Sequence, residues 1–236
     1  GGNHSCALAT DGGTYCWGGN GFGQLGDGTT THSAAPVAVA GGLSFTAIAA
    51  GGRHTCGLTA AGAAHCWGLD DSGPLGDGEA AGGDALVPQP VLGGLTFATL
   101  TAGWLHTCGL TAAGEAHCWG RGVEGQLGGG VAADTAFPAA VAGGHTFTAL
   151  SAGPGHGCGI TASGALCWGY NSSGQLGSGA LDPSLAPVAV AGPALAGAAV
   201  GWVHTCGLDA TGGVACWGAN AALELGAGTP RASRVP

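Results

Sequence analysis

The sequence predicts an all-β fold built from five similar units. A two-cysteine segment recurs along the chain, first as NHSCALATDGGTYCWG from Asn3 and then as RHTCGLTAAGAAHCWG from Arg53. The first cysteines of successive copies are 50, 52, 50 and 48 residues apart, which defines a repeat. The 236 residues include 53 glycines and 11 prolines, a content that excludes stacked helices and favours short strands joined by tight turns.

Each repeat divides into four short segments that are typical of strands. In chain order they are an apolar run such as FTAIAAG, an HTCGL segment, an HCWG segment and a proline-containing stretch such as APVAVAGG. No segment carries a sustained helical period with caps. Four strands in such a period fit a β-propeller blade. We therefore expect residues 1–236 to form one propeller domain or a portion of one, with repeat units at about 1–36, 37–90, 91–138, 139–187 and 188–236.

The second and third strands of each repeat are predicted to form a hairpin closed by a disulfide. In the second copy the two cysteines lie symmetrically about Ala61, which leaves a three-residue loop that ends at Gly62. Facing residues on antiparallel strands are close enough for a disulfide, and five such pairs indicate an oxidising compartment. The predicted pairs are Cys6–Cys16, Cys56–Cys66, Cys108–Cys118, Cys158–Cys167 and Cys206–Cys216.

The fourth hairpin departs from this pattern because its cysteines are one residue closer together. Two outcomes are open. The loop tightens to Ala162-Ser163, or the strand pairing shifts through a bulge.

Strand alternation predicts that the cysteines of a blade face one neighbouring blade and the tryptophan faces the other. Zinc is the rival interpretation of the cysteines and histidines. However, His65 points away from Cys56 and Cys66, so we expect no metal site. The recurrent histidines, such as His54, are expected to make a structural hydrogen bond to a neighbouring loop. The alternative is a ring of titrating groups around a central pore.

The run AGxxHTCGLT, followed by xCWGxNxxGQLGxG and a proline, resembles the regulator of chromosome condensation repeat family in five copies over the whole chain. The resemblance implies a β-propeller, in that family usually a ring of seven blades. The cysteine pair departs from the family pattern, which has a hydrophobic pair in the hairpin. Members include guanine-nucleotide exchange factors, inhibitors of β-lactamases, photoreceptors and bacterial secreted proteins. The shared motifs are mainly structural, so the resemblance implies a fold rather than one function.

The ends of the sequence and its composition lead to further expectations. The first copy begins at its second strand, and the last copy ends near the start of its fourth. Methionine is absent, so we expect a processed chain or a portion of a longer one, whose ring is completed or continued by further chain or by another copy. The alanine- and glycine-rich, lysine-free composition suggests a bacterial source.

Charge and hydropathy exclude two classes of partner. Only 7% of residues are charged, and four basic residues against 13 acids give a net charge of −9, which argues against a nucleic-acid partner. No apolar run approaches the roughly 18–20 residues that a membrane-spanning helix needs.

Positions at which the copies differ are candidate binding residues. Trp104 and Trp202 stand where other copies have glycine or proline, and aromatic side chains anchor interfaces and sugars. The alternative is that each tryptophan packs on its neighbouring blade. The loops after CWG also differ, as expected of a repeat scaffold that presents a binding surface. Their candidate residues are Phe22, Asp70, Asp71, Arg121, Glu124, Tyr170 and Asn171.

No catalytic motif appears, and the acids are scattered, so we expect no enzyme activity and no cofactor. The GDG loops, at Asp27 and Asp77, fit turn chemistry better than calcium binding, because other copies lack the acid. We predict a secreted, non-catalytic extracellular scaffold that binds a protein or another ligand through variable loops on one face. The alternatives are a structural subunit of an extracellular assembly, completed by strand addition between copies, and a glycan-binding propeller.

Overall fold

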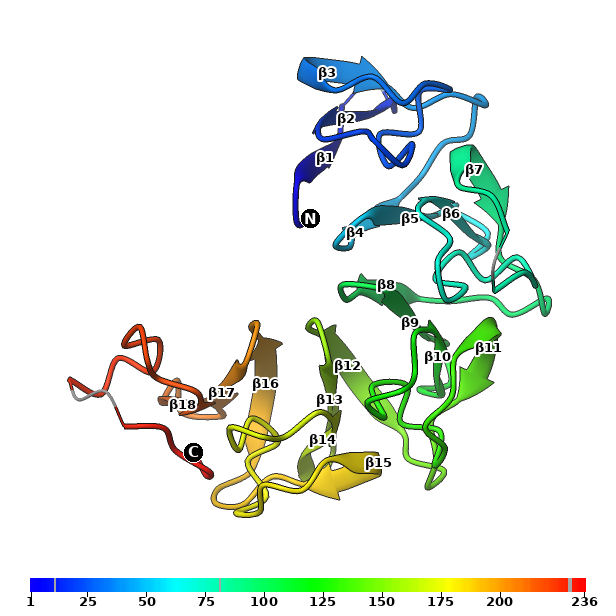
Figure 1. The fold of residues 1–236 in the computed structure, drawn as a ribbon. Helices are drawn as coiled ribbons and strands as arrows, with labels where there is room; N and C mark the ends of the chain where they lie inside the picture. The colour runs from blue at the N-terminus through cyan, green and yellow to red at the C-terminus, as the bar shows by residue number, and fades with distance from the viewer. Residues whose placement is uncertain (11, 81, 229–230) are drawn as a thin grey trace. The chain divides into compact units, whose positions relative to one another are not determined.

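The chain is all-β in the computed structural model, which describes residues 1–10, 12–80, 82–228 and 231–236 (Figure 1). These residues contain no helix, and hence no helix that could cross a bilayer. The strands form five antiparallel sheets, as the sequence predicts. They are β1 (His4–Leu8), β2 (Thr14–Gly18), β3 (Ser33–Ala38), β4 (Ala47–Ala50), β5 (His54–Leu58), β6 (Ala64–Gly68), β7 (Ala85–Pro90), β8 (Thr99–Ala102), β9 (His106–Leu110), β10 (Ala116–Gly120), β11 (Thr135–Ala140), β12 (Phe147–Ala152), β13 (His156–Thr161), β14 (Gly164–Gly169), β15 (Ser184–Ala189), β16 (Leu195–Val200), β17 (His204–Asp209) and β18 (Val214–Gly218).

Strand order within the sheets follows the four predicted segments. The second sheet has the order β4-β5-β6-β7, and the third and fourth sheets repeat it. The first sheet comprises β1-β2-β3 and the last comprises β16-β17-β18. The outer strands β3, β7, β11 and β15 each contain proline, which an edge strand tolerates because one side of it makes no ladder. Three predicted repeat boundaries, after residues 36, 138 and 187, fall inside these outer strands.

The hairpins have the predicted register. Cys56 lies opposite Cys66, the two Cα atoms are 4.1 Å apart, and a disulfide joins the side chains. Gly62 takes a positive φ of 77° at the end of the three-residue loop, a conformation that costs glycine no steric clash. The same pairing and a disulfide occur in every sheet.

The shorter fourth hairpin keeps its cysteines in register. Thr161 pairs with Gly164 and Cys158 pairs with Cys167, so the loop is Ala162–Ser163. Of the two outcomes that the sequence leaves open, the tightened loop is the one that occurs, and the hairpin contains no bulge.

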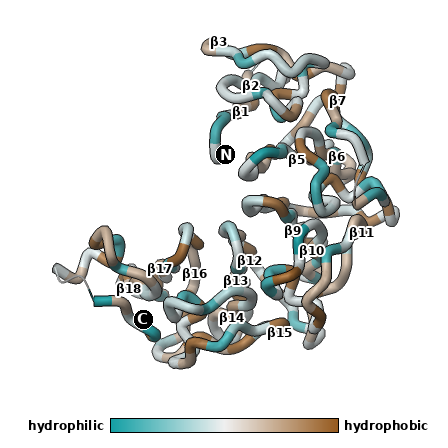
Figure 2. The backbone as a smooth tube through the Cα atoms, in the orientation of Figure 1, coloured by the Kyte–Doolittle hydropathy of each residue, from teal (hydrophilic) through white to brown (hydrophobic). Residues whose placement is uncertain are grey.

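The chain divides into two compact units, each with its own packing between sheets. The first unit comprises Gly1–Ala112, His117–Arg121 and Asp134–Ala139, and the second comprises Ala113–Ala116, Gly122–Ala133 and Ala140–Pro236. Hydrophobic stretches recur in each sheet rather than in one continuous segment (Figure 2). Buried clusters pack between neighbouring sheets within each unit.

The two faces of a blade bury different side chains, as strand alternation predicts. In the first unit, Trp67 packs toward the preceding sheet with Leu25 and Cys16. The disulfide of the same blade, Cys56–Cys66, packs in the core that contains Phe97 and Trp119 of the following blade. The second unit repeats this arrangement, because the Cys158–Cys167 face packs with residues of β16.

Three of the recurrent histidines, His4, His54 and His156, connect neighbouring sheets through a threonine. His4 Nε2 lies 2.7 Å from the Thr55 hydroxyl, which donates to the Gln24 carbonyl at 2.8 Å. Trp67 Nε1 donates to the same carbonyl at 3.0 Å. Because the threonine proton is used on the carbonyl, the histidine must donate from Nε2. The sequence predicted a direct bond from the histidine to a loop; the structure corrects this, since the threonine intervenes.

Candidate binding surface

The variable loops and the turns before the second strands lie at the same end of each sheet. A backbone hydrogen bond joins the two segments in every repeat. Leu69 N–H donates to Arg53 O at 3.0 Å, and Tyr170 N–H donates to Gly155 O at 2.8 Å. We call this edge, with the turn and the loop that the bond joins, the loop end of a sheet. The candidate binding residues from the sequence all belong to it.

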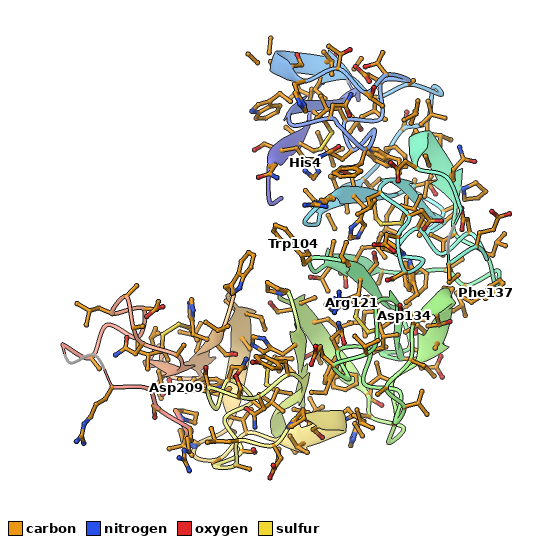
Figure 3. All side chains as sticks on the ribbon, viewed as in Figure 1. His4, Trp104, Arg121, Asp134, Phe137 and Asp209 are labelled. Atoms are coloured by element: carbon orange, nitrogen blue, oxygen red, sulfur yellow. A yellow bond between two sulfur atoms is a disulfide. The ribbon has the colours of Figure 1, made fainter. Side chains whose placement is uncertain are left out.

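Trp104 and Trp202 occupy equivalent turns but differ in their surroundings. The Trp104 ring lies against the backbone of the preceding turn, because a Cβ added at Gly52 would be 2.6 Å from Trp104 Cδ2. Trp104 projects from the turn between β8 and β9, away from Phe137 on the outer strand β11 (Figure 3). Trp202 is 60% exposed, and the preceding turn has Pro154 in place of a glycine. The packing alternative therefore describes Trp104, and Trp202 remains a candidate binding residue.

The aromatic residues of the variable loops have polar neighbours. Phe22 lies under the Arg53 guanidinium, with Cζ 4.9 Å from the ring centroid. This arrangement is a cation–π contact between two loop-end side chains. Tyr170 is 37% exposed, and its hydroxyl accepts a hydrogen bond from Ser172 Oγ at 2.6 Å. Tyr170 and Trp202 are exposed aromatic side chains of the second unit.

Two of the predicted loop residues are buried and hold the loop backbone. Asn171 Oδ1 accepts from Leu176 N–H at 2.9 Å, and Asn171 Nδ2 donates to two loop carbonyls. Asp70 occupies the equivalent position and is 1% exposed. Asp70 and Asn171 are therefore not surface residues that a partner could contact. The sequence contained a signal for this role, because Asn20 and Asn220 recur at the same position.

The remaining predicted candidates are at least partly exposed. Asp71 is exposed, and Arg121 and Glu124 are half-buried. The Glu124 N–H donates to the side chain of buried Gln126 at 2.8 Å. Sequence reasoning missed this function of the glutamine, which fixes the loop on which Glu124 is presented.

Three of the recurrent histidines, His4, His54 and His106, are buried and have strongly lowered pKa values. Burial, followed by the charges of His106 and His4, lowers the pKa of His54 to about 3. Burial lowers the pKa of His106 to about 4, and burial with the terminal amine lowers that of His4 to about 4. These side chains are neutral at physiological pH and carry no charge for a ligand. Cys56 and Cys66 are joined to each other, so neither is a thiolate available to a metal.

Sequence and structure comparisons identify related proteins. Two sequence models described as the Regulator of chromosome condensation (RCC1) repeat match the chain, one over residues 11–58 and 164–208 and the other over residues 45–73, 97–126 and 147–175. Together these matches span more than half of the chain. No curated protein matches the sequence.

Three solved structures show the extent of the likeness. Yeast RCC1 (Prp20), in a structure bound to Kap60, has a TM-score of 0.86 and 21% identity, over 100% of this chain and 58% of that chain. Human WBSCR16 has a TM-score of 0.88 and 20% identity, over 99% of this chain and 64% of that one. The ectodomain of the Physcomitrella patens receptor kinase CR4 has a TM-score of 0.57 and 28% identity, over 92% of this chain and 48% of that one. This chain thus spans less than two thirds of the length of each.

The repeat matches, the five similar copies and the propeller neighbours agree on one assignment. The disulfide in each hairpin sets these blades apart from the hydrophobic pair usual in this family, without changing the strand order. The chain belongs to the regulator of chromosome condensation (RCC1) repeat family.

Proposed function

We propose that this chain is a non-catalytic extracellular β-propeller scaffold that binds a protein through its loop ends. The observation that carries the proposal is Trp202, a tryptophan with 60% of its surface exposed on a turn where the first, second and fourth repeats have glycine or proline. Exposed aromatic side chains on a rigid frame are typical of binding surfaces. Tyr170 adds a second exposed aromatic side chain at a loop end of the same unit.

Two further observations support the proposal. Yeast Prp20, a structural neighbour, is described in complex with Kap60 and with binding properties toward Gsp1p and histones. The fold therefore serves protein binding in a related chain. Disulfides in all five sheets are typical of an oxidising compartment, which supports an extracellular location.

The location is tested by the intact mass of native protein after thiol alkylation. We expect no alkyl group before reduction and ten after reduction, because the sequence has ten cysteines. Alkylation of the unreduced native protein would contradict an extracellular scaffold and reopen an intracellular exchange-factor role.

The binding role is tested by quantitative capture of secreted and surface proteins on the immobilised chain. Trp202→Ala and Tyr170→Ala are expected to lose the specific partner. Phe137→Ala is the matched control, because Phe137 is an aromatic side chain, 50% exposed, on the outer strand β11. A partner retained equally by all variants would contradict the loop-end proposal. A glycan array probed with the same variants distinguishes a glycan ligand from a protein partner.

A further inference from the structure

The loop that follows β6 differs from those of the first, fourth and fifth repeats at one buried position, which is Gly122 in the third repeat. Asn20 occupies this position in the first repeat, where Oδ1 accepts from Leu25 N–H at 2.9 Å and Nδ2 donates to Thr29 O at 2.9 Å. Asn171 and Asn220 make the corresponding bonds in their own loops. The second repeat has Asp70 instead, which accepts from Leu75 N–H at 3.4 Å.

The second oxygen of Asp70 lies where the asparagine amide would donate. Asp70 is 1% exposed, and its Oδ2 is buried without a hydrogen-bond partner among the described residues. An ionised carboxylate offers only acceptors, so it cannot donate to a loop carbonyl as Asn20 does. A buried polar atom left without a bond destabilises the folded loop.

The charged groups that act on Asp70 are all acids. They are Asp77, Glu79 and Asp84. Asp70 Oδ2 and Glu79 Oε2 converge beside Gly82, since a Cβ added there would lie 3.1 and 3.0 Å from them. Asp84 Oδ1 accepts the Asp70 N–H at 3.3 Å. Burial and then the charge of Asp77 raise the pKa of Asp70 to about 7, with smaller increases from Asp84 and Glu79 and a decrease from the Leu75 N–H.

The backbone of this loop is also unlike the others. Ser72 has a φ of 75°, in a region that non-glycine residues seldom adopt, and its N–H donates to Ala80 O at 3.1 Å. Strain of this kind persists only where the surrounding contacts hold it. The bond from Ser72 N–H to Ala80 O closes the loop that contains Asp70.

We propose that Asp70 is a proton-dependent latch of this loop. With a proton on Oδ2, the carboxyl donates to a carbonyl of its own loop, as the amide of Asn20 does, and the loop is closed. Without the proton, a buried anion faces Asp77, Glu79 and Asp84, and the loop opens. The latch is independent of the binding role proposed above.

The direction of the pH effect follows from the change in proton affinity. The pKa of Asp70 in the folded state is above its ordinary value of 3.8, so the folded state binds the proton more tightly than the unfolded state. The contribution of the Asp70 proton to the stability of the folded state is complete below about pH 4, and it is lost as the pH rises through about 7.

The experiment compares the melting temperature of the wild type with that of Asp70→Asn at pH 5 and pH 8. Asparagine supplies the amide of the first, fourth and fifth repeats, so we expect this variant to fold. We expect near-equal melting temperatures at pH 5 and a melting temperature for Asp70→Asn at least about 3 °C higher at pH 8. The Ser72 amide of the wild type should also exchange at least about tenfold faster at pH 8 than at pH 5, after correction for intrinsic exchange.

Three control variants separate the latch from a general charge effect. Asp71→Asn removes a charge from the exposed neighbouring residue. The difference between its melting temperature and that of the wild type should be the same at pH 5 and pH 8. Asn20→Asp places an acid beside Asp27, so its melting temperature should fall between pH 5 and pH 8 as that of the wild type does at Asp70. Asn171→Asp has Ser178 in place of the neighbouring acid, so its melting temperature should fall less. A difference in melting temperature between the wild type and Asp70→Asn that is the same at both pH values would overturn the proposal. The proposal would also be overturned if 1 mM CaCl₂ raised the melting temperature of the wild type at pH 8 but not that of Asp70→Asn. A cation rather than a proton would then close the loop.

Discussion

At the scale of single residues, a threonine hydroxyl connects the Nε2 atom of three recurrent histidines to the backbone of a neighbouring loop. In the first unit, His54 Nε2 lies 2.9 Å from Thr107 Oγ1, which donates to Pro74 O at 3.0 Å. Trp119 Nε1 donates to the same carbonyl at 3.0 Å. The bonded groups are buried, so they are shielded from water that could replace a lost partner.

Thr107→Val tests this connection. Valine keeps the branched shape but leaves the buried His54 Nε2 without an acceptor. We expect a loss of about 1–3 kcal/mol in the free energy of unfolding, measured by urea denaturation. The control is Thr99→Val at an exposed position of β8, and equal stability of the two variants would contradict the argument.

A second residue-scale prediction concerns the space beneath Trp104. Gly52→Ala would place a Cβ 2.6 Å from both Trp104 Cδ2 and the Trp104 carbonyl oxygen. The ring must move, so we expect a changed near-ultraviolet circular dichroism spectrum and a loss of about 1–3 kcal/mol. Gly83→Ala, where nothing lies within 4 Å of the new Cβ, should change neither quantity. An unchanged spectrum for Gly52→Ala would show that Trp104 does not pack there.

The residue scale also shows where sequence reasoning reached its limit. The cysteine partners could be predicted because both strands of a hairpin are local and their register follows from one turn. The burial of Asp70 and Asn171 was missed, although asparagine at the equivalent positions 20 and 220 was a signal for it, because these loops were analysed as variable surface segments. Trp104 and Trp202 looked equivalent in sequence, and only the packing against Gly52 separates them.

At the scale of elements, each hairpin is held by strand pairing, a glycine turn and a disulfide. The double variant Cys56→Ala/Cys66→Ala removes the disulfide while leaving the turn at Gly62. We expect a loss of about 2–3 kcal/mol from the freed loop entropy, with a further loss because both sulfur atoms are buried.

The measurement is urea denaturation of this double variant and of the wild type without reductant. The comparison variant is Cys6→Ala/Cys16→Ala, whose Cys6 is only half-buried and which should lose less. A smaller loss for the buried pair than for the Cys6–Cys16 pair would refute the packing contribution.

Strand order could be predicted because four segments recur in the same order between glycines and prolines. The outer strands were harder to predict. The pairing of β6 with β7 shifts between Cys66 and Gly68, and β2 and β14 show the same irregularity. A proline interrupts the alternation of the outer strand, so the sequence offers no register for this pairing.

At the scale of the whole molecule, the buried histidines make the free energy of unfolding fall as the pH is lowered. Their pKa values in the folded state, about 3 for His54 and about 4 for His4 and His106, lie below the ordinary value of 6.5. The unfolded chain therefore binds protons that the folded chain rejects. Stability is complete above about pH 6.5 and is lost as the pH falls toward 4, the opposite direction to the effect of Asp70.

His106→Leu tests the acid dependence without breaking a bond. Both ring nitrogens of His106 are buried and have no hydrogen-bond partner among the described residues, so leucine removes unsatisfied polar atoms and retains apolar bulk. We expect stability at pH 7.5 equal to or above that of the wild type, and a shallower loss of unfolding free energy between pH 6.5 and 4.5, by about 1 kcal/mol or more. If His106→Leu keeps the wild-type slope, acid sensitivity comes from other groups, and His106 accepts its proton in the folded state.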